Sequence, residues 1–318
     1  MSDPYERFES HTLPNGVQVH TAHLPERPVQ VIRFVIGAGH YHGPRGLAHY
    51  TEHMVANSVR TGEAEKLRVE LETLGGQFVG GTTNYEKTWY GFTLPARFSF
   101  QSYCDRLFTY IFNPSWKHND ADEKRIFASE RNQREVLTPF KEKFGLLARQ
   151  NVIPSHFSQG VQALNTRFGS FQEINARRIE DVVDFHQRYY HAGNVKIFTA
   201  GPLPVADVLQ SLSQSGFGGL SVPSAGVLAA NIPSCGSPQP LRLPQAAFHN
   251  PDDKSSTLMC SFAFEDMSTP QRVLMRRIFG HQLHTHLRER SALVYSVDLN
   301  EDPLGGQSYA FEVEAGGI

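Results

Sequence analysis

The sequence places two histidines and a glutamate where they could hold a metal ion and use it. They lie in the run His49-Tyr50-Thr51-Glu52-His53, an H-x-x-E-H array. On a helix, His49 and His53 are one turn apart on the same face, so both imidazoles can reach one ion. Glu52 lies beside them and is available as a general base on a water held by the metal. Because the chain has 15 histidines, chance could also produce the array, and independent support is needed.

A catalytic zinc site needs a third protein ligand, and a helix expected over residues 120–137 offers Glu123, Glu130 and Glu135. Glu123 and Glu130 are seven residues apart, or two helical turns, and therefore share a face, whereas Glu135 points elsewhere. A lone glutamate on such a helix is usually a solvated surface residue, so it is the pairing that raises these two. Helix geometry alone does not choose between Glu123 and Glu130.

The bulk composition is that of a globular protein without a polyanionic partner. A chain of 318 residues fits about two domains, and 40% hydrophobic residues allow a real core. The formal net charge of -2, without any dense basic block, disfavours nucleic acid. Three scattered cysteines argue against a disulfide framework and for a reducing compartment. Without an apolar N-terminal stretch or a run of about 18 apolar residues, we expect no signal peptide, no membrane span and a cytoplasmic location.

Turn signals and hydrophobic periodicity predict strands alternating with helices along most of the chain. In the first part we expect strands over 10–24 (a hairpin), 29–36, 77–94 (a pair) and 196–200. The expected helices there begin near 46 and cover 63–74, 98–111, 120–137, 140–150, 174–190 and 204–212. A Ser-, Gly- and Pro-rich stretch, 213–244, reads as a linker. After it we expect strands over 257–264, 294–298 and 308–314 and a helix over 269–290.

Strands interleaved with helices on both sides of the linker predict an α+β fold of two domains. We assign residues 1–215 to a metal-binding domain, 216–244 to the linker and 245–318 to a second domain. The second domain is much shorter than the first and stops directly after a strand, which would leave an unpaired sheet edge. We therefore expect the second domain to be incomplete in this chain.

The two-part metal signature resembles that of the inverzincins, the pitrilysin/insulinase family of zinc peptidases. In that family a glutamate follows H-x-x-E-H at a distance of 77 residues, and Glu130 lies 77 residues after His53. The family also has an acidic residue seven positions before that ligand, where this chain has Glu123. Supporting similarity extends over nearly the whole chain, at LPNGV (13–17), GAGHYHGPRGLAHYTE (37–52), the double glycine at 75–76 with its following strand, and 169–201.

The resemblance implies a zinc endopeptidase with one Zn²⁺ per chain, held by His49, His53 and Glu130. Glu52 would be the general base for the attacking water, and Glu123 would orient a ligand histidine or tune the site. The fold implied is two related domains, each a mixed, largely antiparallel sheet packed with helices. The substrates implied are peptides or short unfolded segments enclosed in a clamshell between two halves. The second half would come from a C-terminal continuation, a second copy or a partner subunit.

The strand after the double glycine is expected to receive the substrate as an added strand, at Val79, Gly80, Gly81 and Thr82. This stretch departs from the family's Asn-Ala-x-Thr run, because it is one residue longer and lacks the asparagine. Backbone pairing needs no particular side chain, so edge-strand binding stays expected while subsite preference is open. The pair Gly80-Gly81 could instead mark a bulge.

The segment 287–296 resembles the family's LREKRGLAYSV stretch. Arg288 and Tyr295 match, by their spacing of seven, the pair that binds the substrate carbonyl and stabilises the oxyanion in catalytic members. Two alternatives stay open: a surface arginine with a core tyrosine, or a pair that serves another copy's zinc. His40 and His42, in the loop before the first histidine of the array, are expected to be polar loop residues rather than ligands.

The main alternative to an enzyme is a non-catalytic structural or partner subunit, since the family contains such members. Those subunits typically lose one or more zinc-site residues, whereas this chain has all four. A zinc hydrolase acting on a non-peptide amide is a third interpretation, against which the edge strand argues weakly. Some bacterial members process peptide precursors of cofactors or natural products, and the sequence leaves the substrate and pathway open.

Overall fold

The computed structural model describes residues 7–58, 63–84, 86–95, 99–114, 116, 120–132, 168–221, 257–264, 268–291, 294–305 and 308–317. The chain divides into two compact units, Met1–Ala128 with Thr166–Ala230 and Ser129–Asn165 with Asn231–Ile318. The helix expected over 140–150 and the later part of the expected linker lie outside the described residues. Within the described part, no helix is both long and apolar enough to span a membrane.

A six-stranded mixed sheet forms the first unit. Its strands are β1 (Glu9–Thr12), β2 (Gln18–His23), β3 (Val29–Ile36), β4 (Gln77–Thr83), β5 (Thr88–Pro95) and β6 (Val195–Gly201). Their order in the sheet is β1-β2-β6-β3-β5-β4, which puts β4 at one edge. Strands β2 and β6 run parallel, and the other four pairings are antiparallel. This is the mixed, largely antiparallel sheet of the α+β fold that we expected.

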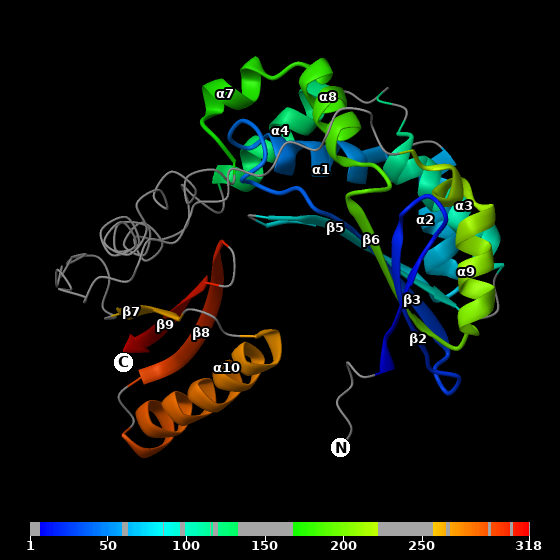
Figure 1. Cartoon of the computed structure of the whole chain (residues 1–318). Coiled ribbons are helices and arrows are strands. Elements are labelled where there is room, and N and C mark those ends of the chain that lie inside the picture. The colour runs from blue at the N-terminus through cyan, green and yellow to red at the C-terminus, as the bar shows by residue number, and fades with distance from the viewer. Residues whose placement is uncertain are drawn as a thin grey trace. The chain divides into compact units, whose positions relative to one another are not determined.

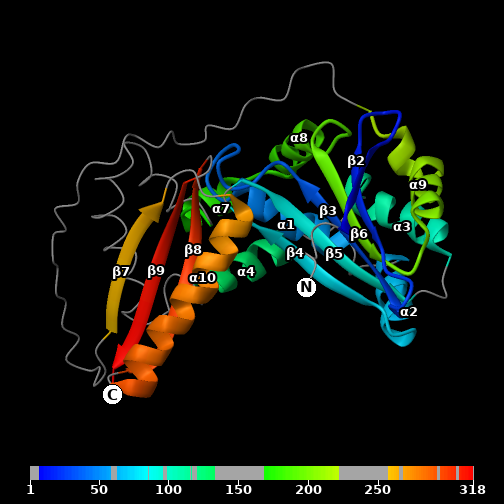
Figure 2. The ribbon, with the colours of Figure 1, turned by 60° about the horizontal axis from the view of Figure 1, so that its bottom comes forward.

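Helices gather on one face of this sheet, as Figures 1 and 2 show for α1, α3, α8 and α9. The helices are α1 (Leu47–Ser58), α2 (Glu63–Thr73), α3 (Phe100–Phe112), α4 (Asp120–Arg131), α7 (Phe171–Ala176), α8 (Ile179–Tyr189) and α9 (Val205–Gln214), with a 3-10 helix, η3 (Gly216–Gly219). Helix α4 runs across the boundary between the two units, with residues 120–128 in the first.

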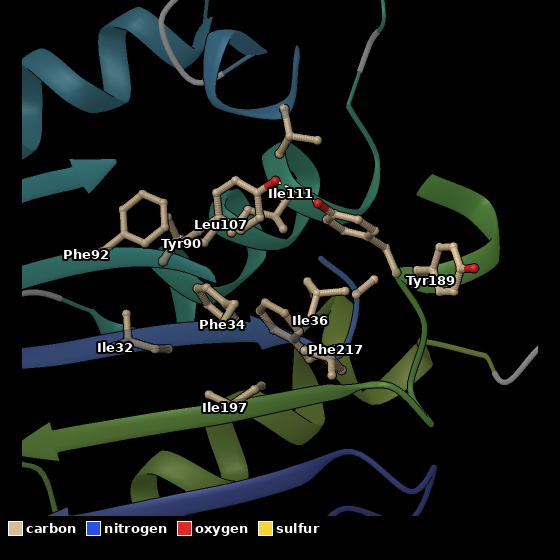
Figure 3. Close-up of a cluster of buried hydrophobic side chains, with 14 of the residues drawn as sticks. Ile32, Phe34, Ile36, Tyr90, Phe92, Leu107, Ile111, Tyr189, Ile197 and Phe217 are labelled. Carbon is tan, nitrogen blue, oxygen red and sulfur yellow. Dashed lines mark hydrogen bonds between the residues drawn. The ribbon is translucent and has the colours of Figure 1, made fainter. Parts of the chain in front are cut away.

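The core lies between the sheet and this helical layer. Strand β3 shows why: Ile32, Phe34 and Ile36 alternate along it and are fully buried, while Arg33 between them is exposed. Figure 3 shows these three side chains packed against Tyr90, Phe92, Leu107, Ile111, Ile197 and Phe217. Because one face of the sheet is buried, a slip of one residue in β3 would turn its apolar side chains into solvent.

The prediction of one helix over residues 174–190 is wrong. The stretch 174–190 is not continuous but splits into α7 and α8, with Arg177 and Arg178 in extended conformations between them. In a single helix, Arg178 would lie one turn after the buried Ile174 and face the core. Instead, the backbone N–H of Arg178 donates to Asp181 at 2.8 Å and starts α8 in a new register, with Val182 buried.

The expected linker also begins later than its composition indicated. Residues 216–219 form η3, and Phe217 is fully buried, stacked on Phe34 with ring centroids 4.9 Å apart. Asn15 in the first hairpin donates to the Phe217 carbonyl at 2.7 Å and to the Leu220 carbonyl at 2.9 Å. The start of the assigned linker, 216–244, therefore belongs to the packing of the first unit, which glycine-rich composition concealed.

The second unit has a three-stranded antiparallel sheet of order β7-β9-β8 among its described residues. Its elements are β7 (Thr257–Phe264), α10 (Thr269–Leu283), a π-helix, η4 (His284–Arg290), β8 (Val294–Gly305) and β9 (Ser308–Gly317). The order strand, helix, strand, strand agrees with the expectation, although β8 is longer than the predicted 294–298. Helix α10 starts with a capping box in which the backbone N–H of Ser268 donates to Gln271 at 2.9 Å.

A buried histidine in the helical layer makes the fold sensitive to acid. The Nε2–H of His186 donates to the Ile111 carbonyl at 2.7 Å, and its ring stacks on Tyr190 at 4.2 Å. Burial lowers the pKa of His186 to about 4, although the hydrogen bond to Ile111 opposes this shift. The native state therefore keeps the imidazole neutral at a pH where the unfolded chain already binds a proton.

We predict that this mismatch weakens folding as the pH falls from about 6.5 toward 4, by about 2 kcal/mol at pH 5. Denaturant unfolding of the metal-free protein between pH 7 and pH 5 measures the loss. The variant His186→Gln keeps a donor for Ile111 but does not titrate, so its free energy of unfolding should change less over this range. An identical pH dependence in both proteins would contradict the assignment.

Candidate metal centre

Helix α1 carries the H-x-x-E-H array, and a glycine at its start allows the approach. Gly46 has φ +73°, and a Cβ at this position would collide with the carbonyl group of Phe168. The helix then runs inward, with Tyr50, Met54 and Val55 buried among the core residues. This packing holds α1 against β4 and β5, so the array faces the edge of the sheet.

The structure brings the three predicted residues of the array together. One ligand atom each from His49, Glu52 and His53 lies within 4.8 Å of the others. Nε2 of His49 is 3.7 Å from a carboxylate oxygen of Glu52, and the two imidazole rings are 4.8 Å apart. The side chains are 13%, 7% and 14% exposed, which leaves the cluster partly accessible from outside rather than sealed in the core.

Glu123 joins this cluster from α4. Its Oε1 lies 2.8 Å from Nδ1 of His53, and the residue is buried. A proton on Nδ1 that is donated to this carboxylate leaves the lone pair on Nε2, the ring atom that would bind the metal. One turn earlier, the Tyr50 hydroxyl donates to Asp120 at 2.7 Å, so two polar contacts tie α1 to α4.

Two phenylalanines surround the imidazoles. Phe127 packs edge-on against His49 at 4.9 Å and His53 at 5.0 Å, and Phe168 packs against His49 at 4.9 Å. Both phenylalanines are buried, so they hold the rings without competing for hydrogen bonds. His40 is also buried, with its ring 5.9 Å from that of His49.

The two loop histidines differ in their contacts. His42 accepts a hydrogen bond from the Gly39 backbone N–H at 3.0 Å and packs on Tyr189 at 5.2 Å. His40 donates its own backbone N–H to the Asn84 carbonyl at 2.9 Å, which ties the loop before α1 to the β4–β5 connection. The contacts of His42 therefore stabilise the loop, whereas the ring of His40 lies beside the cluster of His49, Glu52 and His53.

Glu130, the predicted third ligand, lies on α4 two turns after Glu123 and is partly buried. Its role as a ligand stays a prediction from the sequence. Within the described residues, the group of metal-type donors that converges is His49, Glu52 and His53. Glu52 is therefore placed where it could either bind the metal or act as a base, and its position alone does not distinguish the two roles.

The donor set fits zinc. Imidazole nitrogens and carboxylate oxygens are the ligands that zinc takes in catalytic sites. Glu52 and Glu123 also bring two buried carboxylates to the cluster, and a buried charge is costly unless it is compensated. A divalent cation held by the neighbouring imidazoles would add to that compensation, and the contact of Glu123 with His53 already orients one of these imidazoles.

The predicted substrate strand is β4, which pairs with β5 on one side and with no other strand of the described sheet. The register shifts between Phe78 and Gly80, so Val79 is an additional residue on the edge strand and is 48% exposed. The bulge that Gly80-Gly81 indicated in the sequence is therefore present, one position earlier. Gly80, Gly81 and Thr82 follow it along the edge.

Arg288 and Tyr295 both belong to the second unit. Arg288 lies in η4, is exposed, and has its guanidinium 3.5 Å from Nε2 of His284. Tyr295 lies at a register shift between Val294 and Ser296 near the start of β8. Their proposed contact with a substrate carbonyl stays a prediction.

Two features of the site were not predicted from the sequence: the packing of Phe127 and Phe168 around the imidazoles, and the hydrogen bond from Tyr50 to Asp120. Phe127 could have been found, because it lies four residues after Glu123 and three before Glu130, on the face that the two glutamates share. Phe168 could not, since it is far from the array in sequence and reaches it only through the close passage of Gly46.

Comparison with known proteins places these observations in a family. Residues 18–142 match the family model described as Insulinase (Peptidase family M16), and residues 178–316 match the model described as Peptidase M16 inactive domain. The chain is 28% identical over 258 residues to the coenzyme PQQ synthesis protein F of Pseudomonas aeruginosa, covering 76% of this chain and 30% of that protein. It is 28% identical over 185 residues to the mitochondrial presequence protease of Saccharomyces cerevisiae, covering 54% and 19%.

A further relative, described as an uncharacterized zinc protease of Rickettsia felis, is 24% identical over 308 residues, covering 92% of this chain and 69% of that protein. The chain thus spans about a third or less of the first two relatives' own lengths. Among solved structures, a protease from Helicobacter pylori has a similar fold, with a TM-score of 0.78 at 16% identity, covering 98% of this chain and 75% of that one. Pitrilysin has a TM-score of 0.69 at 18% identity, covering 100% and 34%.

The two family models lie in order along the chain and together cover both units. The H-x-x-E-H array and the helix that bears Glu123 and Glu130 all fall within the insulinase match. The sequence signature, the α+β architecture and these matches therefore agree that the chain belongs to peptidase family M16.

Proposed function

We propose that this chain is a zinc-dependent endopeptidase that cuts peptides or short unfolded polypeptides. The observation that carries the proposal is the 2.8 Å contact between Nδ1 of His53 and Glu123, beside the convergence of His49, Glu52 and His53. A buried carboxylate on the outer nitrogen of a histidine is the arrangement that orients metal-binding imidazoles in zinc enzymes. The relatives described as zinc proteases support the same assignment.

In this proposal His49, His53 and Glu130 hold the zinc, and Glu123 fixes the tautomer and orientation of His53. When bound, zinc acts as a Lewis acid that activates water and polarises a carbonyl group. Phe127 and Phe168 keep the imidazole rings from rotating away from the ion. The three proposed ligands thus come from two helices, His49 and His53 from α1 and Glu130 from α4.

Glu52 is the proposed general base. It accepts a proton from the water that attacks the scissile carbonyl and returns that proton to the nitrogen of the leaving amine. One carboxylate can perform both transfers because it lies beside the cluster and at the edge of the sheet, where the peptide would bind. If Glu52 were a ligand instead, its removal would weaken metal binding, and hydrolysis would be lost as a consequence.

The peptide would bind as an added strand along β4, at Val79, Gly80, Gly81 and Thr82. The unpaired backbone groups of an edge strand offer hydrogen bonds to any extended peptide, so the pairing tolerates many sequences. Arg288 and Tyr295 would donate to the oxygen that gains charge during the attack. We propose that they reach a zinc site when two halves close around the peptide, the second half coming from a continuation of the chain, a second copy or a partner subunit.

The alternative is a non-catalytic partner subunit within the same family. It is favoured by one observation, the match of residues 178–316 to a model described as an inactive domain. The two functions differ in their metal content. An enzyme should bind zinc at about one equivalent per chain, whereas a structural subunit should fold without it.

We predict that Glu52→Gln keeps about one equivalent of zinc and lowers peptide hydrolysis by about 100- to 10,000-fold, because the amide cannot accept the proton. Metal analysis and cleavage of a fluorogenic peptide library measure the two effects on the same sample. The control is Glu180→Gln, which alters an exposed glutamate in the first turn of α8 and should leave both unchanged. Retained hydrolysis would remove Glu52 as the base, and loss of the zinc would make it a ligand.

We predict that Glu123→Gln weakens zinc binding by about 10- to 100-fold, because the neutral amide orients His53 less strongly than a carboxylate does. Competition with a chelator of known affinity measures this change. The matched control is Asp120→Asn, which weakens the neighbouring tie between α1 and α4 without touching a ligand. Equal losses of zinc affinity in both variants would mean that Glu123 acts only by joining the helices.

A further inference from the structure

Gly81 lies directly over the carboxylate of Glu52. It pairs with the fully buried Tyr90 in the sheet, so both positions face the helical layer. A Cβ at Gly81 would collide with Oε1 of Glu52 and would lie 2.7 Å from its Cδ and 2.8 Å from its Cγ. The end of the Glu52 side chain therefore occupies the space that any larger residue at this position would need.

The bulge at Val79 explains why this residue faces Glu52. Phe92 and Tyr90 are two residues apart on β5 and face the core together, and their partners on β4 are Phe78 and Gly81. Those partners are three residues apart, which a regular strand would put on opposite faces. The extra residue, Val79, restores the alternation and turns Gly81 toward α1.

The kind of atom that Gly81 approaches decides what a side chain there would do. The three heavy atoms nearest to a Cβ at Gly81 all belong to the Glu52 side chain, which can rotate without moving any backbone. Gly39 provides a contrast, because a Cβ there would lie 2.5 Å from the Lys87 backbone nitrogen and 2.8 Å from the Glu86 carbonyl carbon. A side chain at Gly39 therefore has to move backbone, whereas one at Gly81 has to move the proposed base.

Tyr90 lies near the same carboxylate. Burial raises its pKa well above the usual value, and the charges of Tyr190 and Glu52 raise it further. Its hydroxyl is 2.8 Å from that of Tyr190, and both tyrosines are buried. The Glu52 carboxylate is thus near both this tyrosine pair and Gly81 of the edge strand.

We propose that Gly81 is a positioning residue for Glu52: the missing side chain lets the carboxylate lie against the substrate-binding edge, where it can reach the attacking water. This role rests on the proposed function and adds to the expected part of Gly81 in backbone pairing. The proposal explains why β4 has a glycine at position 81. The bulge turns this position toward Glu52, and a glycine leaves room for the Glu52 side chain.

The kinetic test is Gly81→Ala in the full chain. The methyl group should displace the carboxylate and lower kcat by about 10- to 100-fold. Zinc should stay at about one equivalent, and KM for a fluorogenic peptide should change less than about twofold. A raised KM with unchanged kcat would overturn the proposal, because it would mean that the methyl group obstructs the peptide instead.

A double-mutant cycle with Glu52→Ala makes the test specific. Alanine removes every Glu52 atom that the added methyl group would meet, so the residual kcat no longer depends on where the carboxylate lies. In that background Gly81→Ala should lower kcat by less than about twofold further, a strong departure from additivity. Equal losses of kcat in the two backgrounds would show that Gly81 acts independently of Glu52, and would overturn the proposal.

A second cycle needs neither activity nor metal. In the zinc-free protein, Gly81→Ala should lower Tm by less than about 4 °C, and by nothing further once Glu52→Ala has emptied the space. Gly39→Ala should lower Tm more, and Gly219→Ala, which meets no atom within 4 Å, is the control for an added methyl group. A loss at Gly81 that persists in the Glu52→Ala background would contradict the contact.

The two cycles separate failure of this inference from failure of the proposed function. A wild-type chain that binds zinc but cuts no peptide even when its second half is present refutes the endopeptidase, while the thermal cycle still measures whether Gly81 and Glu52 share one space. A chain that cuts peptides, with additive effects in both cycles, retains the function and loses the positioning role of Gly81.

Discussion

The contact between the buried Glu123 carboxylate and His53 is the constraint on which the site depends. A carboxylate that is 4% exposed is costly unless it is paired, so α4 must lie where Glu123 meets the imidazole. The same two helices meet one turn earlier through Tyr50 and Asp120, and both contacts join residues 70 positions apart. Together, these two contacts fix the position of α1 along the axis of α4.

Much of the fold follows from patterns within single elements. Strand β3 was predicted at its observed bounds because its apolar residues form one run bounded by turn signals, and β7 likewise. The errors arise where long-range packing decides. The break between α7 and α8 depends on where Arg178 would point against the core, and the burial of Phe217 depends on Phe34, nearly two hundred residues earlier.

The site divides in the same way. His49 and His53 could be predicted because helical spacing is a local property, and the pairing of Glu123 with Glu130 is local as well. The contact of Glu123 with His53 depends on how two helices pack against each other, and the periodicity of a single helix does not predict it. The extra residue on β4 was visible in the sequence, but its effect, the rotation of Gly81 toward Glu52, appears only in the register of the sheet.

The match to the inactive-domain model and the residues of the candidate metal centre lie in different parts of the chain. That match covers residues 178–316, whereas His49, Glu52, His53, Glu123 and Glu130 all lie within the insulinase match at 18–142. Among the described residues, metal-type donors converge in the first unit alone. The inactive-domain model therefore matches a part of the chain that holds none of these five residues.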